Sequence, residues 1–396
     1  MDQEIEKTRQ DIAAFLQCGQ NTTSKIPGVV FHPGSLPVVH FHGTRLERAI
    51  AAGSFCRPFA RRISGSLFRW IVDEFGSSII SPHLRPNAES FCKVFIPGMA
   101  RLWLWHRLPH DLKQELRQMC RAAGVNSNIA AFIILLAEFE MLLNYRGCST
   151  IAAGPPLTKP HELIMGRNLD FDSLGLADAL HLVQVHHPEE PDEIPSACLG
   201  WLGFWGTLTG WNKAGLSLAC TVVYNSKKND EPRVFTFERA VPMAWAYTRL
   251  LRHAPDVKTA VKMLHQMKPM APSNVMLADS TGKAVVVEWA PNRMICRPMD
   301  NDLLVATNGF RTPEMFSEPD ICDRYDGTMQ SVRFIPSASY NASLMRRQLH
   351  SVNQGGLTLH SAIFEPVKRR VHVAINPPPS TRGDWHEIDW DIWSPR

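Results

Sequence analysis

The chain has 396 residues, of which 44% are hydrophobic and 20% are charged, and its formal net charge is +4. This composition is ordinary for a globular protein, and the length allows a large core in one or two domains. So small a net charge gives no case for nucleic-acid binding, and the aromatic residues are not interleaved with runs of Lys and Arg. The 9 cysteines are scattered without a CxxC pair, which indicates mostly reduced thiols that hold no metal.

No export or membrane signal is visible in the sequence. Met1–Glu6 is acidic and polar, so we expect a cytoplasmic protein without a secretory signal. The most apolar stretch, Ile129–Ala137, is about half as long as a membrane span, and Glu138 and Glu140 follow it. We interpret this stretch as part of a buried helix and expect no transmembrane segment.

The part of the chain before residue 147 has a mainly helical pattern. Gln3–Gln17 has helical spacing and few breakers, and Val38–Thr44 is typical of a short strand that enters a loop. Capping and stop residues predict a basic helix over 109–121 and a second helix over about 126–145.

After residue 148 the pattern changes to strands, with two helices predicted over 237–251 and 256–266. Asn212-Lys213 and Thr281-Gly282 are typical of hairpin turns between strands. Strands, then helices, then strands favour stacked antiparallel sheets with helices outside, which is an α+β architecture. The predicted strands are Leu163–Phe171, Leu180–Val185, Leu216–Tyr224, Val275–Ala278, Ala284–Trp289, Leu303–Thr307 and Val371–Ile375.

Gly147-Cys148 marks the junction between the two parts, where an apolar helix ends and strand-like sequence begins. The strand that follows carries Arg167, which could favour the thiolate of the cysteine, and Asp170, which could accept hydrogen bonds from an amine. This layout suits a nucleophile that is made by cutting the chain at its own amine. Residues three apart on a strand normally face opposite sides, so the layout requires a twist or bulge near Asn168.

Five motifs follow one another along the chain: Cys148-Ser149-Thr150, Gly166–Phe171, Leu208–Leu216, Val285–Glu288 and Thr307-Asn308. With these motifs in this order, the chain resembles the cysteine N-terminal-nucleophile hydrolases over about residues 145–330. It is most similar to the penicillin acyltransferase group, and also to the acid ceramidase and N-acylethanolamine amidase group and the bile-salt hydrolases. Gly43-Thr44 with Glu47 and Gly53 is similar to the leader signature of the penicillin acyltransferase group, and so long a leader argues against the bile-salt hydrolases.

The resemblance implies a four-layer αββα sandwich of two antiparallel sheets, preceded by a mainly helical leader. It also implies self-cleavage between Gly147 and Cys148. The products would be an α-subunit, residues 1–147, and a catalytic β-subunit, residues 148–396, which stay together as a heterodimer. The new α-amine of Cys148, with a pKa near ~8, would act as the base for its own thiol.

The same resemblance assigns roles to four further residues. Arg167 polarises the thiol and Asp170 holds the α-amine. Asn308 donates a hydrogen bond to the oxyanion, and Arg324 is the candidate for the arginine that follows this asparagine in the family. The second oxyanion donor stays open. The competing arginines are Arg346 and Arg347.

We therefore expect an amidase or acyltransferase that cleaves the amide bond of a small N-acyl substrate through a Cys148 thioester, without a cofactor. A conventional cysteine peptidase that uses His161 or His181, and an inactive binding protein of the same fold, remain open. His40 and His42 could share a strand face, but with no third ligand nearby we expect no metal site. Aromatic residues that belong to the core or line an acyl pocket are Trp201, Trp205, Trp211 and Tyr224.

Overall fold

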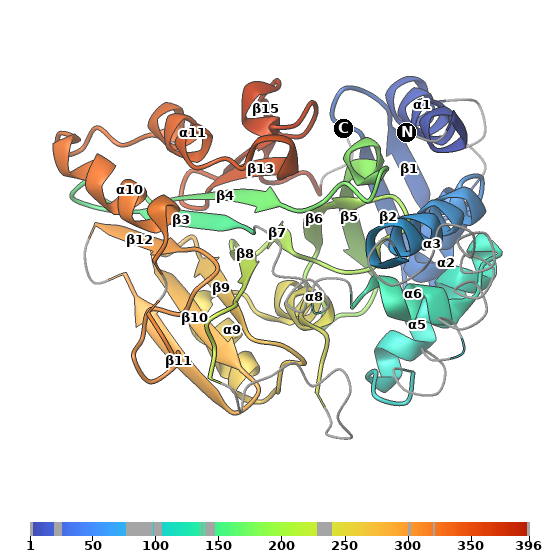
Figure 1. Ribbon diagram of the computed structural model, residues 1–396, viewed down its shortest axis with the longest axis horizontal. Helices are drawn as coiled ribbons and strands as arrows, with labels where there is room; N and C mark the ends of the chain where they lie inside the picture. The colour runs from blue at the N-terminus through green and yellow to red at the C-terminus, as the bar shows by residue number, and fades with distance from the viewer. Residues whose placement is uncertain are drawn as a thin grey trace. The chain divides into compact units, whose positions relative to one another are not determined.

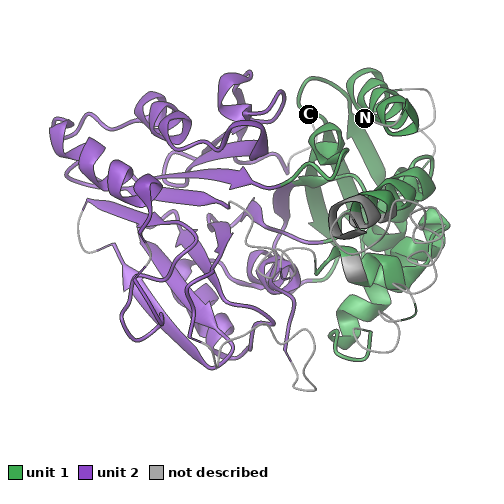
Figure 2. Cartoon of the chain, viewed as in Figure 1, with its two compact units in different colours: residues 1–136, 172–190, 200–205 green, residues 137–171, 191–199, 206–396 purple. Residues whose placement is uncertain are grey.

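The computed structural model describes two compact units, shown in different colours in Figure 2. Unit 1 comprises residues 1–136, 172–190 and 200–205, and unit 2 comprises residues 137–171, 191–199 and 206–396. Most of the predicted leader therefore shares unit 1 with two segments that follow Cys148. The described residues are 3–19, 26–76, 98, 105–135, 138, 147–227, 240–299, 302–319 and 321–393.

The described residues of unit 1 that precede Cys148 are mainly helical, as predicted. Its helices are α1 (Gln3–Cys18), α2 (Arg45–Cys56), α3 (Ala60–Gly76), α5 (His110–Ala123) and α6 (Ser127–Ile133). Its strands are β1 (Val29–His32), β2 (Val38–Gly43) and β5 (His181–Pro188). The β2 strand pairs antiparallel with β1 and parallel with β5. The buried side of α1, with Ile12 and Phe15, packs against Phe41 of β2 and Phe55 of α2 in one apolar cluster.

The residues of the leader signature form the start of α2 and allow α2 to pack closely against α5. Gly43 has a φ of +113°, in the region that favours glycine. Thr44 is the N-cap, and it forms a capping box with Glu47, whose Oε2 accepts from the Thr44 backbone N–H at 2.8 Å. At Gly53 a Cβ would overlap the carbonyl oxygen of Met119 in α5, so glycine allows the two helices to approach closely. The signature thus has a structural explanation within unit 1.

Unit 2 contains two sheets whose neighbouring strands are antiparallel. In the first, strands run in the order β6 (Ser196–Trp201), β7 (Thr209–Asn212), β8 (Ser217–Val222), β9 (Ser273–Ala278), β10 (Ala284–Ala290) and β11 (Arg293–Pro298). In the second, the order is β12 (Leu303–Ala306), β3 (Ser149–Ala153), β4 (Ile164–Asp170), β13 (Thr358–Glu365), β14 (Arg370–Ala374) and β15 (His386–Asp389).

Helices cover both sheets of unit 2. The first sheet contacts α8 (Met243–His253) and α9 (Val257–His265), and the second contacts α10 (Asp323–Ser331) and α11 (Ala342–Ser351) (Figure 1). The two sheets contact each other through β3 with β8 and β10 with β12. Unit 2 is therefore the predicted αββα sandwich.

The predicted strands are all present at closely similar bounds, and both predicted hairpins form. One helix prediction is partly wrong: α8 begins at Met243, because Pro242 precedes it and the Val241 backbone bonds to Lys268 and Met270 instead. Residues 237–239 of that prediction lie outside the described residues. The end of the helix predicted over 126–145 also lies outside them, at 136–137 and 139–146.

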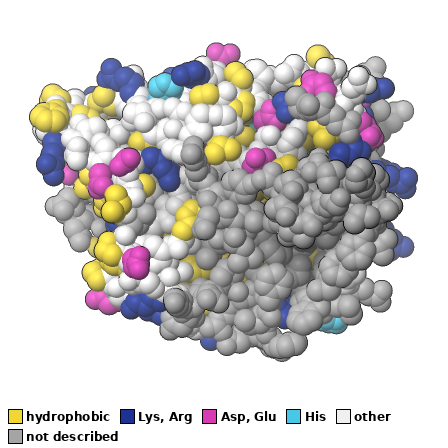
Figure 3. All heavy atoms as spheres, in the orientation of Figure 1, with side chains coloured by type: hydrophobic (Ala, Val, Ile, Leu, Met, Phe, Trp, Pro, Cys, Tyr) yellow, Lys and Arg dark blue, Asp and Glu magenta, His cyan; other side chains and the backbone are white. Residues whose placement is uncertain are grey.

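The surface shown in Figure 3 has basic and acidic side chains interspersed over its described part, in keeping with the small net charge. Among the helices that the structure describes, none has the length and apolar character needed to span a bilayer.

Candidate active site

The Gly147-Cys148 junction lies directly before β3, which is the second strand of its sheet and pairs with β12 and β4. Both residues are buried, and Cys148 is 6% exposed. The register places Thr150 of β3 opposite Arg167 of β4, and Ser149 opposite Asn168. This register brings the motif at the start of β3 beside the motif of β4.

The side chains of β4 alternate between the two faces of the sheet. Arg167 donates a hydrogen bond to the carbonyl oxygen of Cys220 on β8, so it faces the other sheet. Asn168 donates to the carbonyl oxygen of Leu349 on α11 at 2.7 Å, so it faces the helices. The twist or bulge expected near Asn168 stays a prediction for β4 itself. The register of β4 with β13 shifts between Thr358 and His360, opposite Asp170 and Leu169.

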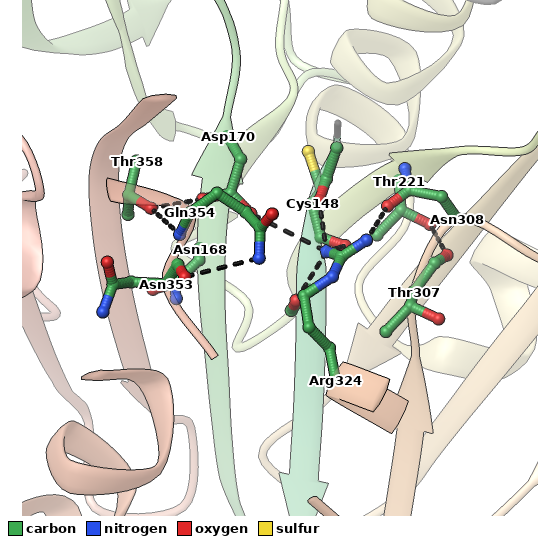
Figure 4. A network of polar contacts seen from close by, with 12 residues as sticks. Cys148, Asn168, Asp170, Thr221, Thr307, Asn308, Arg324, Asn353, Gln354 and Thr358 are labelled. Carbon is green, nitrogen blue, oxygen red and sulfur yellow. Dashed lines mark hydrogen bonds and ion pairs between the residues drawn. The ribbon is translucent and has the colours of Figure 1, made fainter. Parts of the chain in front are cut away.

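Arg324, in the first turn of α10, contacts most of the candidate residues. Its Nη1 donates to the carbonyl oxygens of Gly147 and Cys148, the latter at 2.9 Å, and its Nη2 donates to Asn308 Oδ1 at 2.9 Å. Its Nη1 also lies 3.8 Å from Asp170 Oδ2. Figure 4 shows the guanidinium between the side chains of Asp170 and Asn308, beside Cys148. One planar group of five donors thus joins four of the predicted positions.

Asn308 lies against the scissile position of the predicted cut. Its Nδ2 donates to the carbonyl oxygen of Val222 at 2.9 Å, and its own carbonyl oxygen accepts from the Tyr224 N–H at 2.9 Å. A Cβ on Gly147 would overlap Nδ2 of Asn308, so a larger residue before Cys148 would require the Asn308 side chain to shift.

Asp170 is fully buried and only partly compensated. Its Oδ1 accepts from Thr358 Oγ1 at 2.6 Å, while Oδ2 has no hydrogen-bond partner among the described residues. Burial raises the pKa of Asp170 to about 6, although the Thr358 hydrogen bond and the charges of Arg324 and Arg167 lower it. Arg167 is also fully buried, and its Nε and Nη2 find no partner in the described part of the chain. Buried polar atoms without partners are rare and are typical of functional sites.

Three further residues support this constellation, of which sequence reasoning missed Thr358 and Asn274. Thr358 bonds Asp170 from the neighbouring strand β13. Thr221 Oγ1 donates to the carbonyl oxygen of Thr307 at 2.6 Å, and Asn274 Nδ2 donates to the same oxygen at 3.0 Å. These bonds fix the segment that presents Asn308. Their partners are far apart in sequence, so no local pattern indicates them.

Arg346, the competing arginine, lies elsewhere in unit 2. Its Nη2 is 3.2 Å from His372 Nδ1, and its guanidinium stacks on Trp385. Arg347 has no contact described with the candidate site. The geometry therefore favours Arg324.

The four aromatic residues predicted for core or pocket have different environments. Trp211 is fully buried in unit 2 and packs with Trp390 and Phe364. Trp201 and Trp205 belong to unit 1, where Trp205 Nε1 donates to a buried glutamate, Glu115, at 2.7 Å. Tyr224 is the one of the four whose backbone bonds to Asn308.

Comparison with known families decides what kind of protein this is. Residues 157–379, more than half of the chain, match the family described as acyl-coenzyme A:6-aminopenicillanic acid acyl-transferase. The chain belongs to this acyl-transferase family. The resemblance to the penicillin acyltransferase group is thereby confirmed, and the match includes Arg167, Asp170, Asn308 and Arg324 but begins after Cys148. No curated protein sequence matches the chain.

A search of solved structures finds similar chains at low sequence identity. An N-acylethanolamine-hydrolyzing acid amidase ortholog from Caenorhabditis elegans is 19% identical, with 56% of this chain and 93% of that chain covered and a TM-score of 0.44. A mutant conjugated bile acid hydrolase from Clostridium perfringens is 12% identical, with 61% and 92% covered and a TM-score of 0.43. Penicillin V acylase from Agrobacterium tumefaciens is 13% identical, with 62% and 87% covered and a TM-score of 0.40.

Proposed function

We propose that the chain is an amidase or acyltransferase that first cuts itself between Gly147 and Cys148 and then uses Cys148 as its nucleophile. The observation that carries the proposal is the position of Arg324, which donates to the carbonyl oxygen of Gly147 and to Asn308 Oδ1. The substrate would be a small N-acyl amide. Membership in an acyl-transferase family supports this class of reaction.

Self-cleavage would begin with attack of Cys148 Sγ on the carbonyl carbon of Gly147. Negative charge then develops on the Gly147 oxygen, where the Arg324 guanidinium already donates. Asn308 Nδ2 lies beside the Cα of Gly147 and uses one N–H for the Val222 carbonyl oxygen, so its second N–H is the proposed further donor. The C–N bond breaks, and the nitrogen takes up the thiol proton and becomes the α-amine of Cys148. Water hydrolyses the resulting thioester, which leaves a carboxylate on Gly147 and restores the thiol.

The mature site would use the new α-amine as a base. An α-amine has a pKa near ~8, so a useful fraction is neutral at pH 7 and can take the proton of the thiol. Asp170 Oδ2, which is buried and without a hydrogen-bond partner among the residues described, is available to accept from this amine. Arg167 supplies positive charge that favours the thiolate.

Acyl transfer would then proceed in two steps. The thiolate attacks the acyl carbonyl of the substrate, and the departing amine receives the proton held by the α-amine. The thioester on Cys148 is resolved by water, which gives hydrolysis, or by a second amine, which gives transfer. Asn308 Nδ2 and Arg324 lie where they can stabilise the oxyanion in both steps.

Pairing of β2 with β5 supports an αβ heterodimer after the cut. The leader supplies β2, and β5 comes from beyond Cys148. The two strands pair in parallel from Val38 opposite Val183 to Gly43 opposite Pro188. A ladder of backbone hydrogen bonds would hold the leader to the catalytic fragment.

Denaturing mass spectrometry of the purified protein tests the proposal. We expect two fragments, residues 1–147 and 148–396, from the wild type, and one intact chain from Cys148→Ala. Wild-type protein should release amines from N-acyl amides of varied chain length, and Cys148→Ala should not. An intact wild-type chain with full activity would favour a conventional cysteine peptidase, and cleaved protein without turnover of any substrate would favour a binding protein.

A further inference from the structure

Three histidines of unit 1 meet at the pairing of β2 with β5. His40 and His42 are two residues apart on β2 and point to the same face. His187 on β5 lies opposite His42 in the parallel register. The expectation of no third ligand is therefore wrong, because it considered only residues near in sequence. His187 is brought to the pair by the fold.

The ligand nitrogens of these rings lie close together. His40 Nδ1 is 2.9 Å from His187 Nε2, and one ligand atom from each of the three residues lies within 4.8 Å of the others. Zn–N bonds of 2.0–2.1 Å in a tetrahedral site place the nitrogens about 3.3 Å apart. Adjustments of roughly an ångström would therefore bring the three nitrogens around one ion.

The ring orientations show which side chain must move. The rings of His42 and His187 are stacked, with centroids 4.1 Å apart and planes 9° from parallel. Converging lone pairs require one ring to turn, and His42 is exposed, so its ring can turn without displacing core side chains. His40 is half-buried and held between β1 and β5, which gives the site one fixed ligand.

A shared hydrogen bond accounts for only two of the three rings. In the pair His40–His187 one nitrogen donates and the other accepts, and this leaves His42 stacked on the pair without explaining why a third imidazole is there. Neutral imidazole is the form of histidine that binds metals.

We propose that His40, His42 and His187 bind one divalent transition-metal ion, with Zn²⁺ as the expected ligand. Three imidazoles suit Zn²⁺, Cu²⁺ and Ni²⁺ and leave a fourth position for water. Two ligands come from the leader and one from the segment after Cys148. If the chain is cut as proposed above, the ion links the two fragments, and this second role rests on the proposed function while metal binding does not.

Metal titration of the full chain tests the site. After dialysis against a chelator, we expect one Zn²⁺ to bind per chain, and Co²⁺ to give the visible absorption of a tetrahedral site. His187→Ala should weaken binding by roughly 100-fold or more, beyond the 10–100-fold that loss of an outer-shell partner costs. His42→Ala, on an exposed side chain, should do the same without disturbing the fold. His265→Ala, an exposed histidine on α9, is the matched control and should leave binding unchanged.

The outcomes separate the two roles. Absence of stoichiometric binding, or equal binding by wild type and His187→Ala, overturns the site. For cleaved protein, Zn²⁺ should slow the dissociation of the two fragments in mild urea at least tenfold in the wild type and not in His187→Ala. Equal dissociation rates with bound Zn²⁺ would overturn the linking role alone. A chain that stays uncut but binds Zn²⁺ through the three histidines would contradict the self-cleavage and not the metal site.

Discussion

Glu288 and Asp170 are both fully buried carboxylates at strand positions in unit 2, but their partners differ. Glu288 Oε1 accepts from Arg297 Nε at 2.7 Å and from the Arg311 N–H at 2.9 Å, and its Oε2 accepts from the Thr312 N–H at 3.1 Å. Both of its oxygens are thus bonded. Asp170 has a hydrogen bond on one oxygen only, and the nearest charge to the other is Arg324 at 3.8 Å.

The difference is the one expected between a carboxylate that stabilises the fold and one that binds a ligand, which is the role proposed for Asp170. Burying an ion is better compensated when hydrogen bonds reach both oxygens, as at Glu288, whose bonds fix the loop after Asn308. At Asp170 the compensation is incomplete, and burial raises its pKa to about 6. A fold that needed only stability would gain nothing from this arrangement. The comparison therefore predicts opposite consequences when each charge is removed.

The largest expected effect is on turnover when the charge of Asp170 is removed. Asp170→Asn keeps the shape of the side chain and can still accept from Thr358. It has no negative charge with which to hold the proposed α-amine of Cys148. We expect kcat to fall on the order of 10³-fold, within the range of a lost acid–base group. Steady-state assay of an N-acyl amide measures this. Asp323→Asn, an exposed carboxylate next to Arg324, is the control and should retain wild-type activity. Turnover within twofold of wild type would mean that Asp170, like Glu288, stabilises the fold and does not act in the reaction.

A somewhat smaller effect is expected on stability as pH changes. The pKa of Asp170 is about 6 in the folded protein and near 4 when unfolded, so between these values the folded state binds the proton more tightly. The free energy of unfolding from this group therefore falls as pH rises from about 4 to 6, by up to ~3 kcal/mol, and stays low above pH 6. Asp170→Asn has no carboxyl group at this position, so its free energy of unfolding should not show this fall.

Urea unfolding of wild type and Asp170→Asn at pH 4 and pH 7 checks the sign. The variant should be more stable than wild type at pH 7, and the advantage should shrink toward zero at pH 4. A difference that is the same at both pH values would mean that Asp170 is not held at a raised pKa. Cys148→Ala as the background for both proteins keeps the comparison free of self-cleavage.

Replacing Arg324 by lysine should slow the self-cleavage by about 100-fold. Lysine keeps the charge but loses the planar fork that reaches the Gly147 oxygen and Asn308 together. One lost oxyanion donor typically costs roughly 3 kcal/mol of the barrier. The fraction of intact chain over time, read by denaturing gel, gives the rate. Arg346→Lys, on α11 beside Trp385, is the matched control, and equal rates for the two variants would contradict the role of Arg324.

Much of this fold follows from local sequence patterns. The β4 and β10 segments were predictable because alternating or continuous apolar residues with nearby turn signals specify strands. The helix α5 was predictable from its start and from Gly124, which adopts a φ of +73°. The predicted start of α8 was wrong because Pro242 and the backbone bonds of Val241 to Lys268 and Met270 prevent a helix from beginning before Met243.

The site residues that could be predicted from the sequence were those that belong to a family motif. Resemblance to a family pointed to Cys148 and Arg324, and the geometry brings them together. Thr358 and His187 carry no local signal, because their partners, Asp170 and His40, lie 188 and 147 residues away. Such contacts are fixed by the order of strands in the sheets and not by any sequence pattern.

The smallest effect, on activity, is expected from Glu288→Gln, the counterpart of the first prediction. The change leaves Arg297, which is 20% exposed, without its charged partner, and it weakens the bonds to the Arg311 and Thr312 backbone. Hydrogen bonds to a charged group are each worth about 1.5–3 kcal/mol. Partial exposure of Arg297 limits the loss, so we expect the free energy of unfolding to fall by about 2 kcal/mol. Because Asn308 is also held through Val222 and Arg324, kcat per folded molecule should change less than about twofold.

Urea unfolding and active-site titration of Glu288→Gln measure the two quantities separately. If kcat falls as far as in Asp170→Asn while stability is kept, Glu288 acts in the chemistry and the distinction between the two carboxylates fails. If stability falls and kcat is kept, a buried carboxylate with both oxygens bonded serves the fold. Asp170, whose Oδ2 has no hydrogen-bond partner among the described residues, is then the one of the two that can accept from the amine.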